Sequence, residues 1–215
     1  MTRYYQIHPL PIFGNMTVFA QVLDRMQELG MYLMYEISGY RSSTAVTEQV
    51  NALKDRPNLL LWCTADEPDG ISAPLDATTK AYALVYGLDG YHLVSVVLNC
   101  QDYYWIDHAA GTDIIVHDVH MIGNNVSYSN QWNTVCTPDY GDCSCDSCVS
   151  IPAGDSAVVP PNLTLLAGPV LANNGIGSYF NIANRGSSFE DKLDVMGWRR
   201  FKAIWTVPQA FGGAR

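Results

Sequence analysis

Short apolar runs recur along the first two-thirds of the chain and once more near its end. The clearest of them, LLLWC at residues 59–63, is apolar without alternation, which is typical of a parallel strand covered on both faces. The runs alternate with segments of helical pattern. Six strands are therefore predicted, over residues 3–7, 31–37, 59–64, 94–99, 113–118 and 201–207.

Apolar residues between these runs recur at helical spacing. Val18, Val22 and Met26 form one apolar stripe, and Gly30 stands where a helix C-cap glycine belongs. A later helix is predicted to begin at Ser188, which has an acidic residue three positions on, as in a capping box. The helices predicted after the first cover residues 43–55, 75–88 and 189–198.

The spacing of the strands defines the fold class. The first three strands are predicted to begin at residues 3, 31 and 59, and a repeat of this length fits one strand–helix unit. Alternating strands and helices with buried strands predict an α/β fold with a parallel sheet. Periodicity alone does not separate a closed (β/α)₈ barrel from an open doubly wound sheet. No Gly-x-Gly-x-x-Gly follows the early strands, which disfavours a dinucleotide-binding fold.

Two stretches interrupt the alternation. Residues 132–148 are rich in cysteine, and residues 149–186 contain Pro160-Pro161 and an Asn-Asn-Gly run with little charge and no period. A long stretch of this kind inside a compact domain is expected to be an irregular insertion. We therefore expect one domain over residues 1–215 that carries a cysteine-rich loop and this insertion.

Composition and charge narrow the classes of partner. The chain has 215 residues, of which 48% are hydrophobic, so it can bury a core. Its net charge of −9, without a Lys/Arg cluster, argues against nucleic acid and anionic membrane and suits a neutral substrate such as a carbohydrate. No apolar run has the length of a membrane span, and the segment from Met1 to Tyr5 lacks a signal-peptide core. The pattern does not define an oligomeric state.

Cysteines and sequons indicate an extracellular protein. Cys63 and Cys100 end neighbouring predicted strands and either pair or remain buried thiols. The other four cysteines favour two disulfides that pin one loop, and a zinc site is the alternative. These disulfide candidates are Cys136, Cys143, Cys145 and Cys148. Candidate glycosylation sites are Asn15, Asn125 and Asn162.

Carboxylates that follow strands are the strongest candidates for catalysis, because an α/β barrel holds its active site at the carboxyl ends of its strands. Asp66 and Glu67 directly follow the apolar third strand, where burial and neighbouring charge favour a general acid. Glycoside hydrolysis needs a second carboxylate, and Asp118 at the end of the fifth strand is favoured over Glu36 and Asp102. The alternative is that Asp66 or Asp69 simply caps the turn that follows the strand.

Other residues at the strand ends suit binding of a sugar. Aromatic rings stack on the apolar faces of sugars, and polar side chains bond their hydroxyls. The substrate-binding candidates are His8, Asn99, Tyr104, Trp205 and Gln209. No metal site or cofactor is expected, because His117 and His120 lie three apart in a predicted strand end and would point to opposite faces.

Several runs resemble a group of secreted fungal proteins that are assigned to the glycoside hydrolase superfamily of barrels. The resemblance covers roughly residues 5–148 and 187–213. The runs that carry it are IHPLP (7–11), PNLLLW (57–62), TADEPDG (64–70), VSVVLNCQDYY (94–104), CTPDYGDC (136–143) and WTVPQAFG (205–212).

The resemblance implies an incomplete (β/α)₈ TIM barrel of about six of the eight units, in a fragment that lacks the first and last strands. It also implies that the six predicted strands are the second to seventh of the eight barrel strands, so that Glu67 ends the fourth barrel strand as acid/base. The implied activity is that of an extracellular hydrolase acting on O-glycosidic bonds. The seventh strand end, where related barrels hold a nucleophile, has Gln209 and no carboxylate. Asp118 therefore completes an inverting pair, another carboxylate serves, or the chain is a non-catalytic carbohydrate-binding barrel or an inactive fragment. A barrel with open edges is expected to be unstable.

Overall fold

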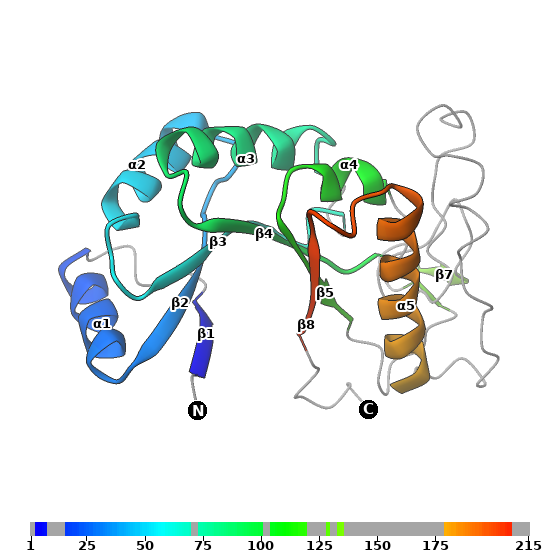
Figure 1. Ribbon diagram of the computed structural model, residues 1–215, viewed down its shortest axis with the longest axis horizontal. Helices are drawn as coiled ribbons and strands as arrows, with labels where there is room; N and C mark the ends of the chain where they lie inside the picture. The colour runs from blue at the N-terminus through cyan, green and yellow to red at the C-terminus, as the bar shows by residue number, and fades with distance from the viewer. Residues whose placement is uncertain are drawn as a thin grey trace.

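The computed structural model describes residues 3–7, 16–69, 73–100, 104–119, 128–129, 133–135 and 179–207. Six parallel strands form one sheet that curls into a half-barrel (Figure 1). The strands, in their order across the sheet, are β1 (Arg3–Ile7), β2 (Met31–Glu36), β3 (Leu59–Asp66), β4 (Leu93–Leu98), β5 (Ile114–Asp118) and β8 (Ala203–Val207). A separate antiparallel pair joins β6 (Tyr128–Ser129) and β7 (Thr134–Val135).

The strand order shows how the sheet is wound. Each strand of the large sheet pairs with the preceding strand of that sheet, so the described strands are added in one direction only. A doubly wound sheet reverses direction at a switch point, and the described strands contain no such reversal. The predicted parallel α/β architecture is therefore confirmed. The six predicted strands also agree with the observed ones to within two residues at each end.

Helices cover the outer side of the curled sheet (Figure 1). Phe19 of the first helix packs with Tyr35 and Trp62 on this side, and Phe189 of the last helix packs with Ile115. Burying each such large side chain contributes about 1.5–3 kcal/mol, so the outer layer supplies much of the core. The helices are α1 (Met16–Glu28), α2 (Ser43–Leu53), α3 (Ala77–Leu88), α4 (Trp105–Ala110) and α5 (Tyr179–Val195).

Alternate residues of the same strands point to the opposite, concave side, here called the inner face. In β5, Ile115 contacts the outer layer, whereas Ile114 and Val116 belong to a second apolar cluster. This alternation follows from the two-residue period of a strand. The buried members of the inner face are Met34, Leu61, Cys63, Val97, Ile114 and Val116.

The last helix differs from its prediction. It begins at Tyr179 rather than near Ser188, so Ser188 lies inside α5 and does not cap it. The hydroxyl of Ser188 instead accepts a buried hydrogen bond from Lys192 at 2.9 Å. Residues 179–186, predicted as irregular insertion, are therefore helical, because tertiary burial of α5 outweighs its weak apolar period. The short helix α4 was not predicted either.

The described cysteines are in different states. Cys63 is a free, buried thiol, whereas Cys100 is disulfide-bonded. The two therefore do not pair with each other, which excludes one of the two alternatives from the sequence. The four clustered cysteines and the three candidate glycosylation sites lie outside the described residues. Among the described helices, none has both the length and the apolar character of a membrane crossing.

Candidate functional site

Glu67 has an unusual backbone at the carboxyl end of β3. Its φ is 46°, in the left-handed region that non-glycine residues rarely adopt. The pairing of β3 with β4 shifts register between Cys63 and Asp66, and beyond the shift the Glu67 N–H bonds the carbonyl of Val97 at 3.1 Å. Such conformations cost on the order of 1–3 kcal/mol and cluster at functional sites. The backbone geometry therefore marks Glu67 as a candidate functional residue.

The side chain of Glu67 is held by Asn99. The amide Nδ2 of Asn99 donates a hydrogen bond of 2.7 Å to Oε1 of Glu67. Asn99 directly follows β4, so the bond joins the ends of two neighbouring parallel strands. A donor on a carboxylate oxygen stabilises the ionised form and restricts the rotamer of the side chain. The carboxylate thus has a defined position at this edge of the sheet.

Asp69, two residues after Glu67, links the ends of the same two strands. Its side chain is only 4% exposed. One oxygen accepts the N–H of Cys100 at 2.7 Å, and the other accepts the N–H of Asn99 at 3.4 Å. Buried backbone donors need such acceptors, since leaving one unsatisfied costs about 1–3 kcal/mol. Asp69 therefore stabilises the segment that carries Asn99.

Arg185 of α5 reaches this segment from a distant part of the chain. It is fully buried, and its Nη1 donates a hydrogen bond to the backbone oxygen of Asn99. Asn99 is thereby bonded through its N–H to Asp69, through its carbonyl to Arg185 and through its side chain to Glu67. Four residues from three parts of the fold form one connected group.

Asp66 and Trp205 lie on one row across the inner face. Asp66 pairs with Val97, Val97 with Val116, and Val116 with Trp205. Paired residues of parallel strands point to the same side, so both end residues share the side of Val97 and Val116. Three strand spacings separate them by about 14 Å. Trp205 is 40% exposed, so part of its ring is accessible to a ligand.

Asp118 ends β5 on the inner face as well. It is 9% exposed and follows Val116 by two residues, which places both side chains on one side. Continuing the β4–β5 register by one residue brings Asn99 opposite Asp118. Glu67 and Asp118 therefore flank Asn99 from the two neighbouring strands, with backbones on the order of 10 Å apart. The structure brings these two predicted carboxylates to one end of the sheet.

His117 points to the outer side and takes no part in this group. Its ring lies 5.2 Å from that of Phe189, and neither ring nitrogen has a hydrogen-bond partner within the described part of the chain. Burial, and then the charge of Arg185, lowers the pKa of His117 to about 3. Within the described ranges, no three His, Cys, Asp or Glu side chains gather as a metal site.

The remaining predicted residues fall into two groups. Tyr104 has a φ of 44° and precedes α4, but its side chain is only 6% exposed. His8 and Gln209 lie outside the described residues.

Sequence reasoning also missed two members of the group. Asp69, in the TADEPDG run, is predicted from the sequence only as a possible cap. Arg185 lies in the predicted insertion, where no sequence pattern indicates a functional residue.

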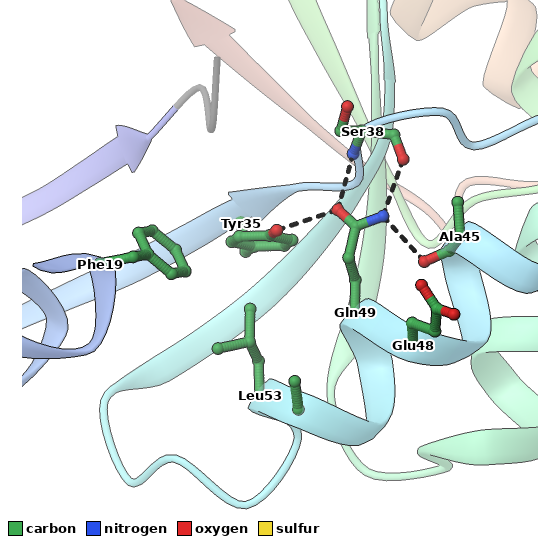
Figure 2. A pocket seen from close by; sticks show the side chains of 8 residues that line it. Phe19, Tyr35, Ser38, Ala45, Glu48, Gln49 and Leu53 are labelled. Atoms are coloured by element: carbon green, nitrogen blue, oxygen red, sulfur yellow. Dashed lines mark hydrogen bonds between the residues drawn. The ribbon is translucent and has the colours of Figure 1, made fainter. Parts of the chain in front are cut away.

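A separate pocket of about 520 Å³ opens on the outer side between α1 and α2 (Figure 2). Phe19, Tyr35 and Leu53 supply apolar walls. Gln49 crosses one end, where its side-chain oxygen accepts bonds from Tyr35 and Ser38 at 2.9 Å and its nitrogen donates to Ser38 and Ala45 at 2.7 and 2.8 Å. The side-chain oxygen of Gln49 thus accepts two hydrogen bonds and its nitrogen donates two, all to groups of the protein. Since Tyr35 belongs to the outer layer, the pocket lies on the opposite side of the sheet from Asp66 and Trp205.

No protein-family model and no curated protein sequence matches this chain.

Proposed function

We propose that this protein is a glycoside hydrolase that cleaves O-glycosidic bonds in an oligo- or polysaccharide, with Glu67 as the proton donor. The observation that supports it most directly is the left-handed backbone of Glu67 at the carboxyl end of a parallel strand, where the Asn99 amide holds the Glu67 side chain in position. The one-directional, curled parallel sheet is consistent with part of a (β/α)₈ barrel, in which active sites lie at this end.

Asp118 is the second carboxylate in this proposal. Inverting glycosidases hold their two carboxyl groups roughly 6.5–9.5 Å apart, so that a water molecule fits between the base and the sugar. The two-strand separation of Glu67 and Asp118 is compatible with that range. Asp118 then accepts a proton from the attacking water, while Glu67 protonates the departing oxygen. Asp66 adds negative charge that stabilises the positive charge developing on the sugar ring.

Substrate binding and location complete the proposal. The accessible ring of Trp205 on the inner face offers a stacking surface for a sugar. The chemistry needs no cofactor or metal, because two carboxylates suffice for glycoside hydrolysis. The net charge of −9 suits a neutral carbohydrate, and the resemblance to secreted proteins supports an extracellular location with glycosylation and disulfides.

The test is release of reducing sugar from a panel of fungal and plant polysaccharides. Glu67→Gln and Asp118→Asn are compared with the parent protein, and Glu48→Gln on the outer helix α2 is the matched control. Activity is expected to fall by at least about 10³-fold in Glu67→Gln and to stay unchanged in Glu48→Gln. Equal activity of the parent and Glu67→Gln would contradict the assignment of the proton donor.

A non-catalytic carbohydrate-binding protein is the second candidate. The observation that favours it is that β8, from Ala203 to Val207, carries an exposed tryptophan but no carboxylate. Calorimetric titration with the same glycans distinguishes the two functions. Binding that is lost in Trp205→Ala but retained in Glu67→Gln, without any release of sugar, would favour the binding protein.

A further inference from the structure

We propose that Arg185 is a positioning residue that acts through Asn99 on the Glu67 carboxylate. The catalytic consequence rests on the proposed function, whereas the positioning itself does not. The contacts run in sequence: Arg185 donates to the Asn99 carbonyl, and the Asn99 side chain donates to Glu67 at 2.7 Å. Since Asp69 bonds the Asn99 N–H, the peptide groups on both sides of Asn99 are held by buried charged residues.

The hydrogen bond to the Asn99 carbonyl explains why a charged residue is fully buried at position 185. Removing a guanidinium from water costs several kcal/mol unless hydrogen bonds and charges compensate it. One helical turn further along α5, the equally buried Phe189 fills the outer core at no such cost. Arg185 has the length and the donors that reach the end of β4, and an apolar residue at its position would leave the Asn99 carbonyl without this donor.

A charged donor suits the task of holding a backbone carbonyl. Charge-assisted hydrogen bonds are stronger than neutral ones and limit the movement of the accepting group. If the carbonyl of Asn99 is released, the peptide plane and the side chain of Asn99 can rotate together away from Glu67. A misplacement of about 1 Å at a reacting group can reduce a rate on the order of 10²-fold. Arg185 would therefore influence catalysis without touching substrate.

Lys192 provides a matched control on the same helix. It is also a buried cation of α5, but its Nζ bonds Ser188 at 2.9 Å and lies 5.7 Å from the ring centre of Trp105. The Lys192 variant therefore removes a buried charge from the same helix while Arg185, the donor to the Asn99 carbonyl, is retained. A purely structural role predicts equal behaviour of Arg185→Met and Lys192→Met. The positioning role predicts that only the Arg185 variant changes the carboxylate.

The experiment follows the titration of the Glu67 carboxyl carbon by NMR in the full chain labelled at glutamate, with Glu67→Gln assigning the signal. An N–H donor favours the ionised carboxylate, so Asn99→Ala and Arg185→Met are expected to move the midpoint to higher pH. Lys192→Met is expected to leave it unchanged. Arg185→Lys keeps the charge and one donor and is expected to restore most of the parent midpoint. If Arg185→Met does not fold, Arg185→Gln, which is neutral and shorter, takes its place and is expected to move the midpoint in the same direction.

Activity separates this inference from the proposed function. An unchanged Glu67 midpoint in Arg185→Met would overturn the positioning role, even if Glu67 proves essential for hydrolysis. A shifted midpoint in a protein that hydrolyses no glycan would support the positioning role and contradict the hydrolase. With hydrolysis present, kcat of Arg185→Met is expected to fall on the order of 10²-fold, with a displaced pH profile and little change in KM.

Discussion

The side-chain amide of Asn99 and the carboxylate of Glu67 meet at 2.7 Å although 32 positions separate them in the chain. The contact depends on the parallel pairing of β3 with β4, which brings the two strand ends to one edge of the sheet. It also depends on the register shift before Asp66 and on the left-handed backbone of Glu67. The same edge contains Asp69, whose buried carboxylate accepts the N–H groups of Cys100 and Asn99.

Asp69→Ala is expected to lower the free energy of unfolding by about 1–3 kcal/mol, because it removes the acceptor of buried N–H groups of Cys100 and Asn99. Urea titration followed by circular dichroism measures the change. The matched variant is Asp76→Ala, which removes an exposed carboxylate that pairs with exposed Lys80 and is expected to cost less than about 1 kcal/mol. Equal losses in the two variants would show that the Asp69 contacts add no stability.

Replacement of glycine by alanine is expected to have opposite effects on stability at Gly111 and at Gly87. A methyl group at Gly111 would lie 2.5 Å from the Cα of Thr79, which is too close for two carbon atoms. Because the backbone of α3 would have to move to relieve this clash, Gly111→Ala is expected to lower the melting temperature markedly. Gly87 lies in α3 with nothing within 4 Å of the added methyl, so Gly87→Ala is expected to gain up to about 1 kcal/mol. Differential scanning calorimetry of both variants tests the pair. Stabilisation by Gly111→Ala would contradict the close approach of α3 to the end of α4.

The stability of the protein is expected to fall as the pH drops below about 6.5, the ordinary value for histidine. Burial lowers the pKa of His108 to about 4, and burial and Arg185 lower that of His117 to about 3. The unfolded chain therefore binds protons that the folded chain excludes, and each histidine contributes about 1.4 kcal/mol of lost stability per pH unit between its unfolded and folded pKa values.

Urea unfolding of the parent and of His117→Gln at pH 7, 6 and 5 measures this dependence. The variant lacks one of the two histidines, so the difference between its stability and that of the parent is expected to shrink as the pH falls. A constant difference across this range would show that His117 takes up its proton equally in the folded and unfolded chains.

The thiol of Cys63 is expected to resist labelling until the protein unfolds. It is fully buried on the inner face, and burial, followed by the nearby charge of Glu36, raises its pKa and suppresses the reactive thiolate. Iodoacetamide at pH 8, with mass spectrometry to locate the label, is expected to modify Cys63 only at the rate of unfolding. Guanidinium chloride serves as the positive control. Rapid labelling in native buffer would contradict the buried position.

The resemblance to glycoside hydrolases led to the choice of Glu67 as proton donor, and this assignment stays a prediction. What the structure adds is the environment of that residue. Asp66, Glu67 and Asp118 were predicted from their positions after apolar strands, and all three lie at the carboxyl ends of neighbouring or nearby strands. The part of Asp69 in holding Asn99 was not foreseeable, because a carboxylate near a turn is equally suited to capping it.

The sequence by itself determined the strands, the parallel class of the sheet and most helices, because burial on two faces imposes an uninterrupted apolar run wherever a strand such as Leu59–Asp66 forms. Only the tertiary structure decided which polar groups meet. The bond between Arg185 and Asn99 spans 86 positions and exists because α5 docks on β4 and β5, whose positions are set by packing at long range. The local sequence pattern does not predict such a contact, because the contact depends on the geometry of the whole sheet.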